Sequence, residues 1–219
     1  MTEAIILIHG LGRTPRSMRP LSLYLNKAGF ATQLFGYDSR RSNMAQIVAQ
    51  LHATIERLRP HHSQIHFVTH SLGGIVLRAY IAQHGTINGR AVMLAPPHHG
   101  SEIIDFWRGG AIRHAFFKQL MGDLALTLHT DANSLPNQLP TLAQHNIGII
   151  AGTRSVEYWF NRLFQTPHDG KVSVDSTRLH TNHAHKTVDA THTFIMNHAK
   201  TRINCLNFLK NGQFVADAS

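Results

Sequence analysis

The chain has 219 residues, of which 42% are hydrophobic and 15% charged, and its formal net charge is +9. This composition is typical of a single globular domain spanning residues 1–219 and excludes a disordered chain. No apolar run approaches the roughly 18 residues of a transmembrane helix, and no signal-peptide pattern is present, so we expect a soluble cytoplasmic protein.

Short apolar or β-branched runs alternate with longer segments of helical period along the whole chain. The runs cover residues 4–8, 32–37, 65–68, 91–95 and 147–151, with a weaker one at 186–189. This alternation predicts an α/β fold with a mostly parallel sheet of about six strands and helices on both faces. In such a sheet, functional groups are expected at the carboxyl ends of the strands.

Three helices are predicted from apolar stripes and their end signals. Residues 47–58 carry one stripe that Pro60 ends, and residues 72–84 form a second helix that Gly85 closes. A final stripe over residues 195–209 places Cys205, the only cysteine, on its buried side. A lone cysteine excludes an internal disulfide.

One connection is much longer than the others, since 51 residues separate Ala95 from Ile147. A long excursion in a compact domain is typical of a lid or binding element, so we interpret 98–145 as a helical cap. Its apolar residues recur at four-residue spacing: Ile112, Phe116, Leu120 and Leu124. A second stripe, residues 156–164, follows the next strand. The sequence leaves open whether these stripes pack in the core or contact a substrate.

The segment Thr69-His70-Ser71-Leu72-Gly73-Gly74 lies between a predicted strand and a helix. A serine at such a turn is held exposed, and the next backbone N–H, that of Leu72, points toward the same site. The helix N-terminus adds positive potential there. Thr69 stands where this motif usually has a glycine. On the local sequence alone, Ser71 fits a helix cap and a nucleophile equally well.

The first strand ends in His9-Gly10-Leu11-Gly12, which favours the nucleophile. A glycine-eased turn here directs the N–H of Leu11 toward the same point as that of Leu72, as an oxyanion hole requires. A dinucleotide fingerprint would need a glycine where Pro15 stands, and no P-loop lysine follows.

A nucleophilic serine needs a base and an orienting acid. His192 follows the last weak strand and precedes the final helix, which makes it the candidate base among 18 histidines. Asp169 lies in a turn flanked by proline and glycine and is the candidate acid. Asp175 and Asp189 are alternatives, although Asp189 is only three residues before His192.

Ser71, Asp169 and His192 follow the chain order of the α/β-hydrolases. The sequence resembles a small bacterial lipase or esterase of this superfamily over nearly its whole length. The matching segments are residues 9–12, 70–74, 95–101, 169–170 and 191–194. The resemblance implies an α/β-hydrolase fold with Ser71 as nucleophile, His192 as general base and Asp169 as its partner. It also implies an oxyanion hole formed by the N–H groups of Leu11 and Leu72.

The implied function is hydrolysis of a carboxylic ester or lipid through an acyl-enzyme, without a cofactor. An acyltransferase or thioesterase with the same triad is the alternative, and a non-catalytic lipid-binding protein is a third. Candidates for substrate contact are His9, Gly10, His70, Trp107, Phe116 and Trp159. We expect no metal site, because the histidine tract at 180–192 lacks cysteine pairs and a His-Glu-x-x-His helix.

The distribution of charge along the sequence implies few classes of binding partner. The basic residues are scattered, and no tract or recognised module predicts binding to nucleic acid. A positively charged surface would allow peripheral contact with an anionic membrane.

Overall fold

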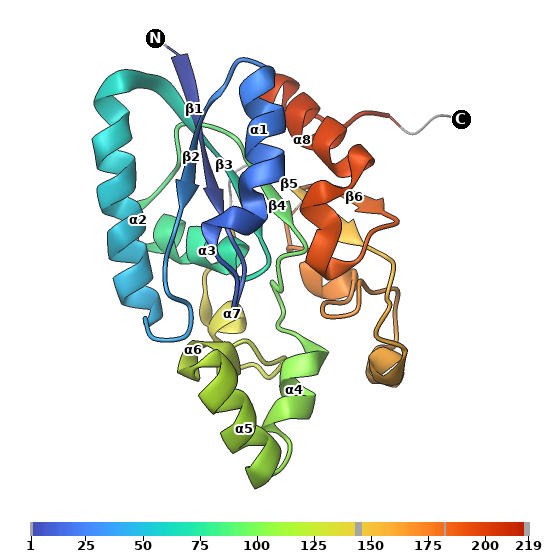
Figure 1. Ribbon diagram of the computed structural model, residues 1–219. Coiled ribbons are helices and arrows are strands. Elements are labelled where there is room, and N and C mark those ends of the chain that lie inside the picture. The colour runs from blue at the N-terminus through green and yellow to red at the C-terminus, as the bar shows by residue number, and fades with distance from the viewer. Residues whose placement is uncertain (1, 143–145, 182, 217–219) are drawn as a thin grey trace.

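The computed structural model describes residues 2–142, 146–181 and 183–216. Six strands form one sheet in the order β2-β1-β3-β4-β5-β6, and every pairing of neighbours is parallel (Figure 1). The strands are β1 (Thr2–Ile8), β2 (Ala31–Phe35), β3 (His62–His70), β4 (Ala91–Leu94), β5 (Ile147–Gly152) and β6 (Ala184–Val188). Each predicted run overlaps one of these strands, so the predicted α/β sheet is confirmed.

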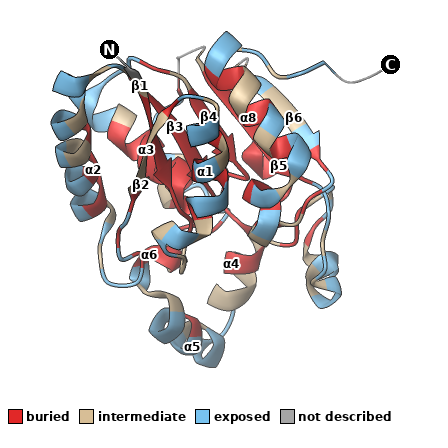
Figure 2. Ribbon diagram, turned by 45° about the horizontal axis from the view of Figure 1, so that its top comes forward, coloured by how far each residue is buried: buried red, intermediate tan, exposed pale blue. Residues whose placement is uncertain are grey.

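The sheet is covered on both faces, which explains its apolar strands. On β1, Ile6 and Ile8 belong to one hydrophobic core, whereas Ile5 and Leu7 belong to the other. All four side chains are fully buried, and each such burial stabilises the fold by about 1.5–3 kcal/mol. The sheet therefore lies in the middle of the molecule, as the buried colouring in Figure 2 shows.

Two helices pack on each face of the sheet. Helices α2 (Met44–Leu58) and α3 (Leu72–His84) contribute to the first core, and α1 (Arg19–Lys27) and α8 (Ala199–Asn211) to the second. The predictions of α2, α3 and α8 are confirmed, and α8 buries Cys205 as expected. Helix α1 was not predicted.

Segment 98–145 contains four short helices at the end of the molecule toward which the strands point (Figure 1). They are α4 (Glu102–Arg108), α5 (Ala111–Met121), α6 (Asp123–Leu126) and α7 (Leu135–Gln138). The segment is called the cap below, and its last residues, 143–145, lie outside the described residues. On α5, Ile112 and Phe116 are exposed, so this stripe does not face a core.

Five 3-10 helices complete the connections: η1 (Pro15–Met18), η2 (Arg59–His61), η3 (Tyr158–Leu163), η4 (Asp175–Thr177) and η5 (His192–Asn197). The stripe at 156–164 includes η3 and its flanking residues, and its Val156 and Trp159 are exposed whereas Phe164 is buried. Among the helices of the described residues, none combines the length and apolar character needed to cross a lipid bilayer.

Candidate active site

Ser71 lies at the sharp turn where β3 ends and α3 begins. Its backbone dihedrals are φ 51° and ψ −121°, a conformation that costs a non-glycine residue about 1–3 kcal/mol. Within the described residues, its side chain makes no capping hydrogen bond to α3. The geometry therefore favours Ser71 as a candidate nucleophile over Ser71 as a helix cap, because the turn holds its Oγ at the wall of a cavity.

The glycines after Ser71 permit the close approach that this turn requires. A Cβ atom on Gly73 would lie 2.6 Å from the carbonyl oxygen of Ile8 on β1, so a larger residue would push strand and helix apart. A Cβ atom on Gly74 would lie 2.8 Å from the Cβ atom of Pro96, so Pro96 requires glycine there. Thr69 Oγ1 would lie 3.4 Å from the added Cβ atom, an ordinary contact, so the turn accommodates threonine at the usual glycine position.

The turn after β1 packs directly against the serine. A Cβ atom on Gly10 would lie 2.9 Å from His70 Nδ1 and 3.1 Å from Ser71 Cβ, so only glycine fits there. Across the described part of the chain, no hydrogen bond engages the backbone N–H of Leu11 or of Leu72. Both N–H groups predicted to form the oxyanion hole are therefore available to a ligand.

His9 lies behind this wall and supports it. Its ring stacks on Tyr37 with centroids 4.3 Å apart, and its Nδ1 donates to the carbonyl oxygen of Gly10 at 2.9 Å. The Tyr37 hydroxyl donates to the His9 carbonyl oxygen at 2.7 Å. Burial lowers the pKa of His9, so the ring is neutral at pH 7 and acts as a structural brace for the turn.

His192 and Asp169 meet beside the cavity. His192 Nδ1 lies 2.7 Å from Asp169 Oδ2, and the backbone N–H of His192 donates to the Asp169 carbonyl oxygen at 2.9 Å. Asp169 Oδ1 accepts the backbone N–H groups of Lys171 and Val172 at 3.0 and 2.9 Å. The loop N–H groups fix the carboxylate, and its Oδ2 contacts Nδ1 of the imidazole. The imidazole is therefore held with Nε2 as its nitrogen available for proton transfer.

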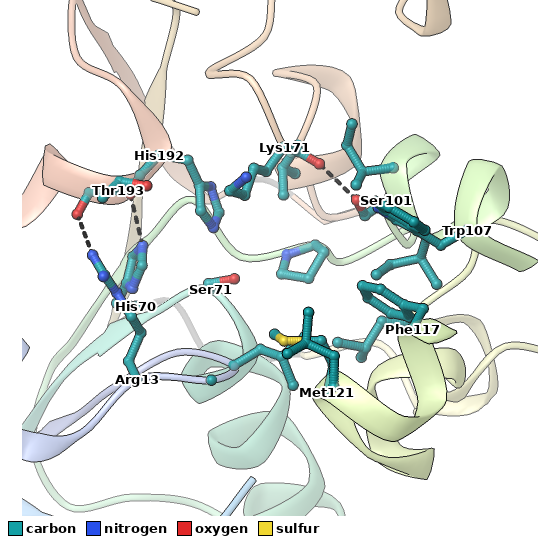
Figure 3. A pocket seen from close by; sticks show the side chains of 18 residues that line it. Arg13, His70, Ser71, Ser101, Trp107, Phe117, Met121, Lys171, His192 and Thr193 are labelled. Atoms are coloured by element: carbon teal, nitrogen blue, oxygen red, sulfur yellow. Dashed lines mark hydrogen bonds between the residues drawn. The ribbon is translucent and has the colours of Figure 1, made fainter. Parts of the chain in front are cut away.

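Ser71 and His192 line the same cavity from opposite elements (Figure 3). Among the described residues, no hydrogen bond joins Ser71 Oγ to the imidazole, a looseness that is common in sites without substrate.

The two alternative acids lie elsewhere. The Asp175 side chain is 62% exposed, and its Oδ1 lies 3.7 Å from Arg178 Nε. Asp189 is exposed after β6. Within the described ranges, Asp169 is the aspartate that contacts the imidazole of His192.

His70 braces the imidazole from the other side. Its Nε2 lies 2.9 Å from the backbone carbonyl oxygen of His192 and must be the donor, because a carbonyl oxygen only accepts. Burial, together with the nearby ring of His192, holds the pKa of His70 well below its ordinary value. A neutral ring therefore fixes the backbone of His192.

The cavity has a volume of about 360 Å³, which is within the range of small-molecule sites. Its wall away from Ser71 is formed largely by apolar side chains of the cap, including Ile104, Trp107, Phe117 and Met121. Figure 3 shows Trp107 and Phe117 on one side of Ser71 and Arg13 on the other. The cavity therefore has an apolar arm and a polar arm that meet at the serine.

Comparison with protein families gives one match, in which the model described as the Alpha/beta hydrolase family covers residues 5–195. The chain belongs to this family. Comparison of the chain with curated protein sequences finds no match.

Solved structures of similar fold include lipases, esterases, a phospholipase and a bromoperoxidase. A phospholipase, PlaB from Legionella pneumophila, superposes with a TM-score of 0.70 at 18% identity, over 97% of this chain and 60% of its own. The lipase BlEst2 from Bacillus licheniformis, in its propeptide form, gives 0.70 at 17% identity, over 100% and 52%. This chain thus spans only 60% and 52% of the length of these two neighbours. A metagenomic carboxyl esterase gives 0.64 at 19% identity, over 88% of this chain and 65% of its own.

The fold brings some of the candidate substrate contacts to the cavity and not others. Trp107 and His70 line the cavity, whereas His9 and Gly10 lie behind its wall. Phe116 and Trp159 are 57% and 66% exposed and lie outside the lining. On α5 the neighbouring Phe117 takes the lining position instead.

Several lining residues were not singled out from the sequence, among them Arg13, Ser101 and Met121. Arg13 follows the turn after β1, and its guanidinium donates to the carbonyl oxygen of Thr193 at 2.9 Å. Ser101 Oγ donates to the carbonyl oxygen of Lys171 at 2.6 Å. Met121 packs on Gly12, since a Cβ there would lie 2.8 Å from its Cε. Arg13 adjoins the predicted oxyanion turn, the one sequence signal that could have drawn attention to it.

The histidine tract forms local contacts. His185 Nε2 lies 2.9 Å from Thr177 Oγ1, and His183 Nδ1 lies 2.7 Å from Thr181 Oγ1. Over the residues that the structure describes, no group of three or more His, Cys, Asp and Glu side chains is arranged to hold a metal ion.

Proposed function

We propose that this protein is a serine hydrolase that cleaves carboxylic esters through an acyl-enzyme. The observation that carries the proposal is the 2.7 Å contact between His192 Nδ1 and Asp169 Oδ2 at the cavity where the strained Ser71 lies. A nucleophile, a base and an orienter of the base at one cavity are the parts that this chemistry requires.

In the proposed reaction, Ser71 Oγ attacks the ester carbonyl carbon while His192 Nε2 takes the hydroxyl proton. Asp169 holds the tautomer with a proton on Nδ1 and stabilises the imidazolium. The N–H groups of Leu11 and Leu72 stabilise the oxyanion. The tetrahedral intermediate then collapses, and the alcohol leaves with the proton from His192. In the second half, His192 takes a proton from water, which attacks the acyl-enzyme, and the carboxylic acid leaves as Ser71 Oγ regains the proton from His192.

An ester is preferred over other acyl substrates because of the apolar arm of the cavity. Trp107, Phe117 and Met121 offer an acyl chain an apolar surface next to Ser71, and burying each methylene contributes about 0.8 kcal/mol. The structural neighbours named as lipases, an esterase and a phospholipase support the same choice. Thioester hydrolysis and transfer to an acceptor other than water would use the same residues.

The test is hydrolysis of p-nitrophenyl esters from two to twelve acyl carbons by the wild type and by Ser71→Ala. We expect the variant to lose at least about 10⁴-fold in kcat. Ser101→Ala is the matched control, because Ser101 lines the same cavity but donates to a backbone carbonyl, and it should keep most of the turnover.

Other outcomes separate the alternatives. Labelling of Ser71 by a fluorophosphonate without ester turnover would favour a thioesterase or acyltransferase. Neither labelling nor turnover would contradict the proposal and favour a non-catalytic lipid-binding protein.

We further propose that the ester is presented at a lipid surface. Ile112 on α5 is 87% exposed and Tyr158 and Trp159 on η3 are 72% and 66% exposed, and both elements project at the same end of the molecule (Figure 1). The exposed Arg113 follows Ile112 on α5 and would favour an anionic surface.

The test is the hydrolysis rate of tributyrin across its solubility limit. We expect a steep rise once droplets form, and Ile112→Ser should reduce that rise without changing the rate below the limit. A rate that saturates smoothly across the limit would argue against action at a surface.

A further inference from the structure

A second hollow adjoins the cavity at its polar arm. It has a volume of about 700 Å³ and is lined in part by Arg13, Tyr37, Asp38, Arg40 and Arg41. The cavity and this hollow, called the arginine groove below, share Gly12 and Arg13. A ligand bound at Ser71 can therefore extend into the groove without crossing the protein interior.

The groove has a surplus of positive charge, because three arginines face one aspartate. Asp38 Oδ1 accepts the backbone N–H groups of Arg40 and Arg41 at 3.0 and 3.3 Å, so it is used to shape the loop. Its Oδ2 lies 3.9 Å from Arg41 Nε, between side chains that are 52% and 88% exposed. Such an exposed pair is weak, and the guanidinium groups remain able to bind an anion.

The groove lies on the side from which the alcohol leaves. The leaving oxygen must lie near His192, because that residue returns the proton to it. Arg13 donates to the carbonyl oxygen of Thr193, the residue after His192, and Figure 3 shows Arg13 and Thr193 across Ser71 from Trp107 and Phe117. The acyl chain thus fits the apolar arm, and the alcohol points toward the arginines.

We propose that the substrate is an ester whose alcohol carries a phosphate group, and that Arg13, Arg40 and Arg41 bind this phosphate. Guanidinium groups match phosphate oxygens in charge and in paired hydrogen-bond geometry. Hydrolysis then gives a carboxylic acid and a phosphate-bearing alcohol. This inference rests on the proposed ester hydrolysis and adds the substrate class.

The test compares 1-octanoylglycerol 3-phosphate with 1-octanoylglycerol, both below their aggregation concentrations. The readout is the ratio of their kcat/KM values, which isolates the phosphate. We expect the wild type to prefer the phosphate ester by about tenfold or more, and Arg40→Gln/Arg41→Gln to lose most of that preference. The preference should also weaken with added salt.

Lys27→Gln/Arg57→Gln is the matched control, because it removes the same charge from exposed positions on α1 and α2 outside the groove. It should retain the wild-type ratio. Asp38→Asn should raise the ratio. Equal ratios in the groove variant, the control and the wild type would overturn the proposal.

A binding measurement distinguishes failure of this inference from failure of the proposed reaction. In the Ser71→Ala background, calorimetry should give tighter binding of the phosphate ester than of the neutral ester, and the groove variant should abolish the difference. Without that difference the groove assignment fails, even where the wild type hydrolyses both esters. With the difference but without turnover in the wild type, the groove assignment holds and the proposed reaction fails.

The source of the phosphate is distinguished by presentation. Oleoyl forms of the same two esters in phosphatidylcholine vesicles test a lipid headgroup, and the dispersed octanoyl forms test a soluble phosphate ester. The larger phosphate preference identifies the source. Inorganic phosphate should compete with the phosphate ester for binding to the arginine groove. If added phosphate does not weaken the binding of the ester, that result would count against a phosphate site.

Discussion

The side chain of Asp169 has no freedom to turn. Its Oδ1 is used by two backbone N–H groups, those of Lys171 and Val172, and its Oδ2 by the imidazole of His192. The carboxylate is thus oriented by its own loop before it orients the histidine. The loop hydrogen bonds require only an acceptor oxygen at this position, whereas the proposed reaction requires a carboxylate at His192.

Asp169→Asn tests this separation. An asparagine can still accept from the two loop N–H groups, but its amide would force His192 Nδ1 to accept rather than donate, which is the wrong tautomer. We expect kcat for an ester to fall about 10³–10⁴-fold with little change in the thermal unfolding midpoint. Asp175→Asn should leave kcat unchanged, and the reverse pattern would assign the acid to Asp175.

For individual residues, the sequence predicts the positions of Ser71 and His192 better than it predicts which aspartate contacts the imidazole. Ser71 and His192 stand at motif positions that fix their place in the fold, and the structure brings them to one cavity. Asp169 was the candidate acid, but the sequence could not exclude Asp175, because the two lie six residues apart in one irregular segment. Only the folded path of that loop places Asp169 at the imidazole and leaves Asp175 exposed.

Strands with a continuous apolar run were predictable, and elements with ambiguous patterns were not. The central strands are apolar because helices cover both faces of the sheet, whereas the edge strand β6 is largely polar. Helix α1 was missed because Leu21, Leu23 and Leu25 alternate as in a strand, although the structure buries the first and third and exposes Leu23. On α5, Leu120 of the predicted stripe lines the cavity together with Phe117 and Met121, which the four-residue spacing did not include.

The buried side chain of Arg78 joins α3 to both ends of the cap. Arg78 on α3 donates to the carbonyl oxygens of His98 at 3.2 Å, Leu139 at 2.8 Å and Pro140 at 3.3 Å. These residues lie at the two ends of the cap. Burial lowers the pKa of Arg78 to about 10, so the guanidinium stays charged at pH 7 and holds both ends together.

Arg78→Met should weaken the attachment of the two ends of the cap to α3. The three carbonyl groups would lose their donor, and we expect a loss of about 2–4 kcal/mol in the free energy of unfolding. Urea denaturation measures this loss, and limited proteolysis should then cut first within the cap. Arg113→Met is the control, because that guanidinium stacks on Phe106 at the cap surface and should cost less than about 1 kcal/mol. Equal losses in the two variants would contradict the role of Arg78.

Across the whole molecule, buried histidines couple stability to pH. Burial lowers the pKa of His9, His70 and His98, and it lowers that of His185 to about 4. Between the folded and unfolded pKa values the unfolded chain binds more protons, so stability rises with pH. The contribution of His185 is therefore full above about pH 6.5 and is lost as the pH falls to about 4.

We expect the thermal unfolding midpoint to drop by several degrees between pH 7.5 and 5.0. Circular dichroism at a series of pH values measures this change. His185→Gln should flatten part of the dependence, whereas His61→Gln, at an exposed position, should leave it intact. A midpoint that is constant over this range would show that the buried rings are protonated without cost.

The burial of Cys205 has a practical consequence. The thiol is fully buried in α8, and burial raises its pKa far above the ordinary value, so maleimide reagents should not modify the native protein. The chain can then be treated as free of reactive cysteine. Ile112→Cys, at the 87% exposed position on α5, would accept a single fluorophore, and its emission would report directly on movement of the cap when an ester or a vesicle is added.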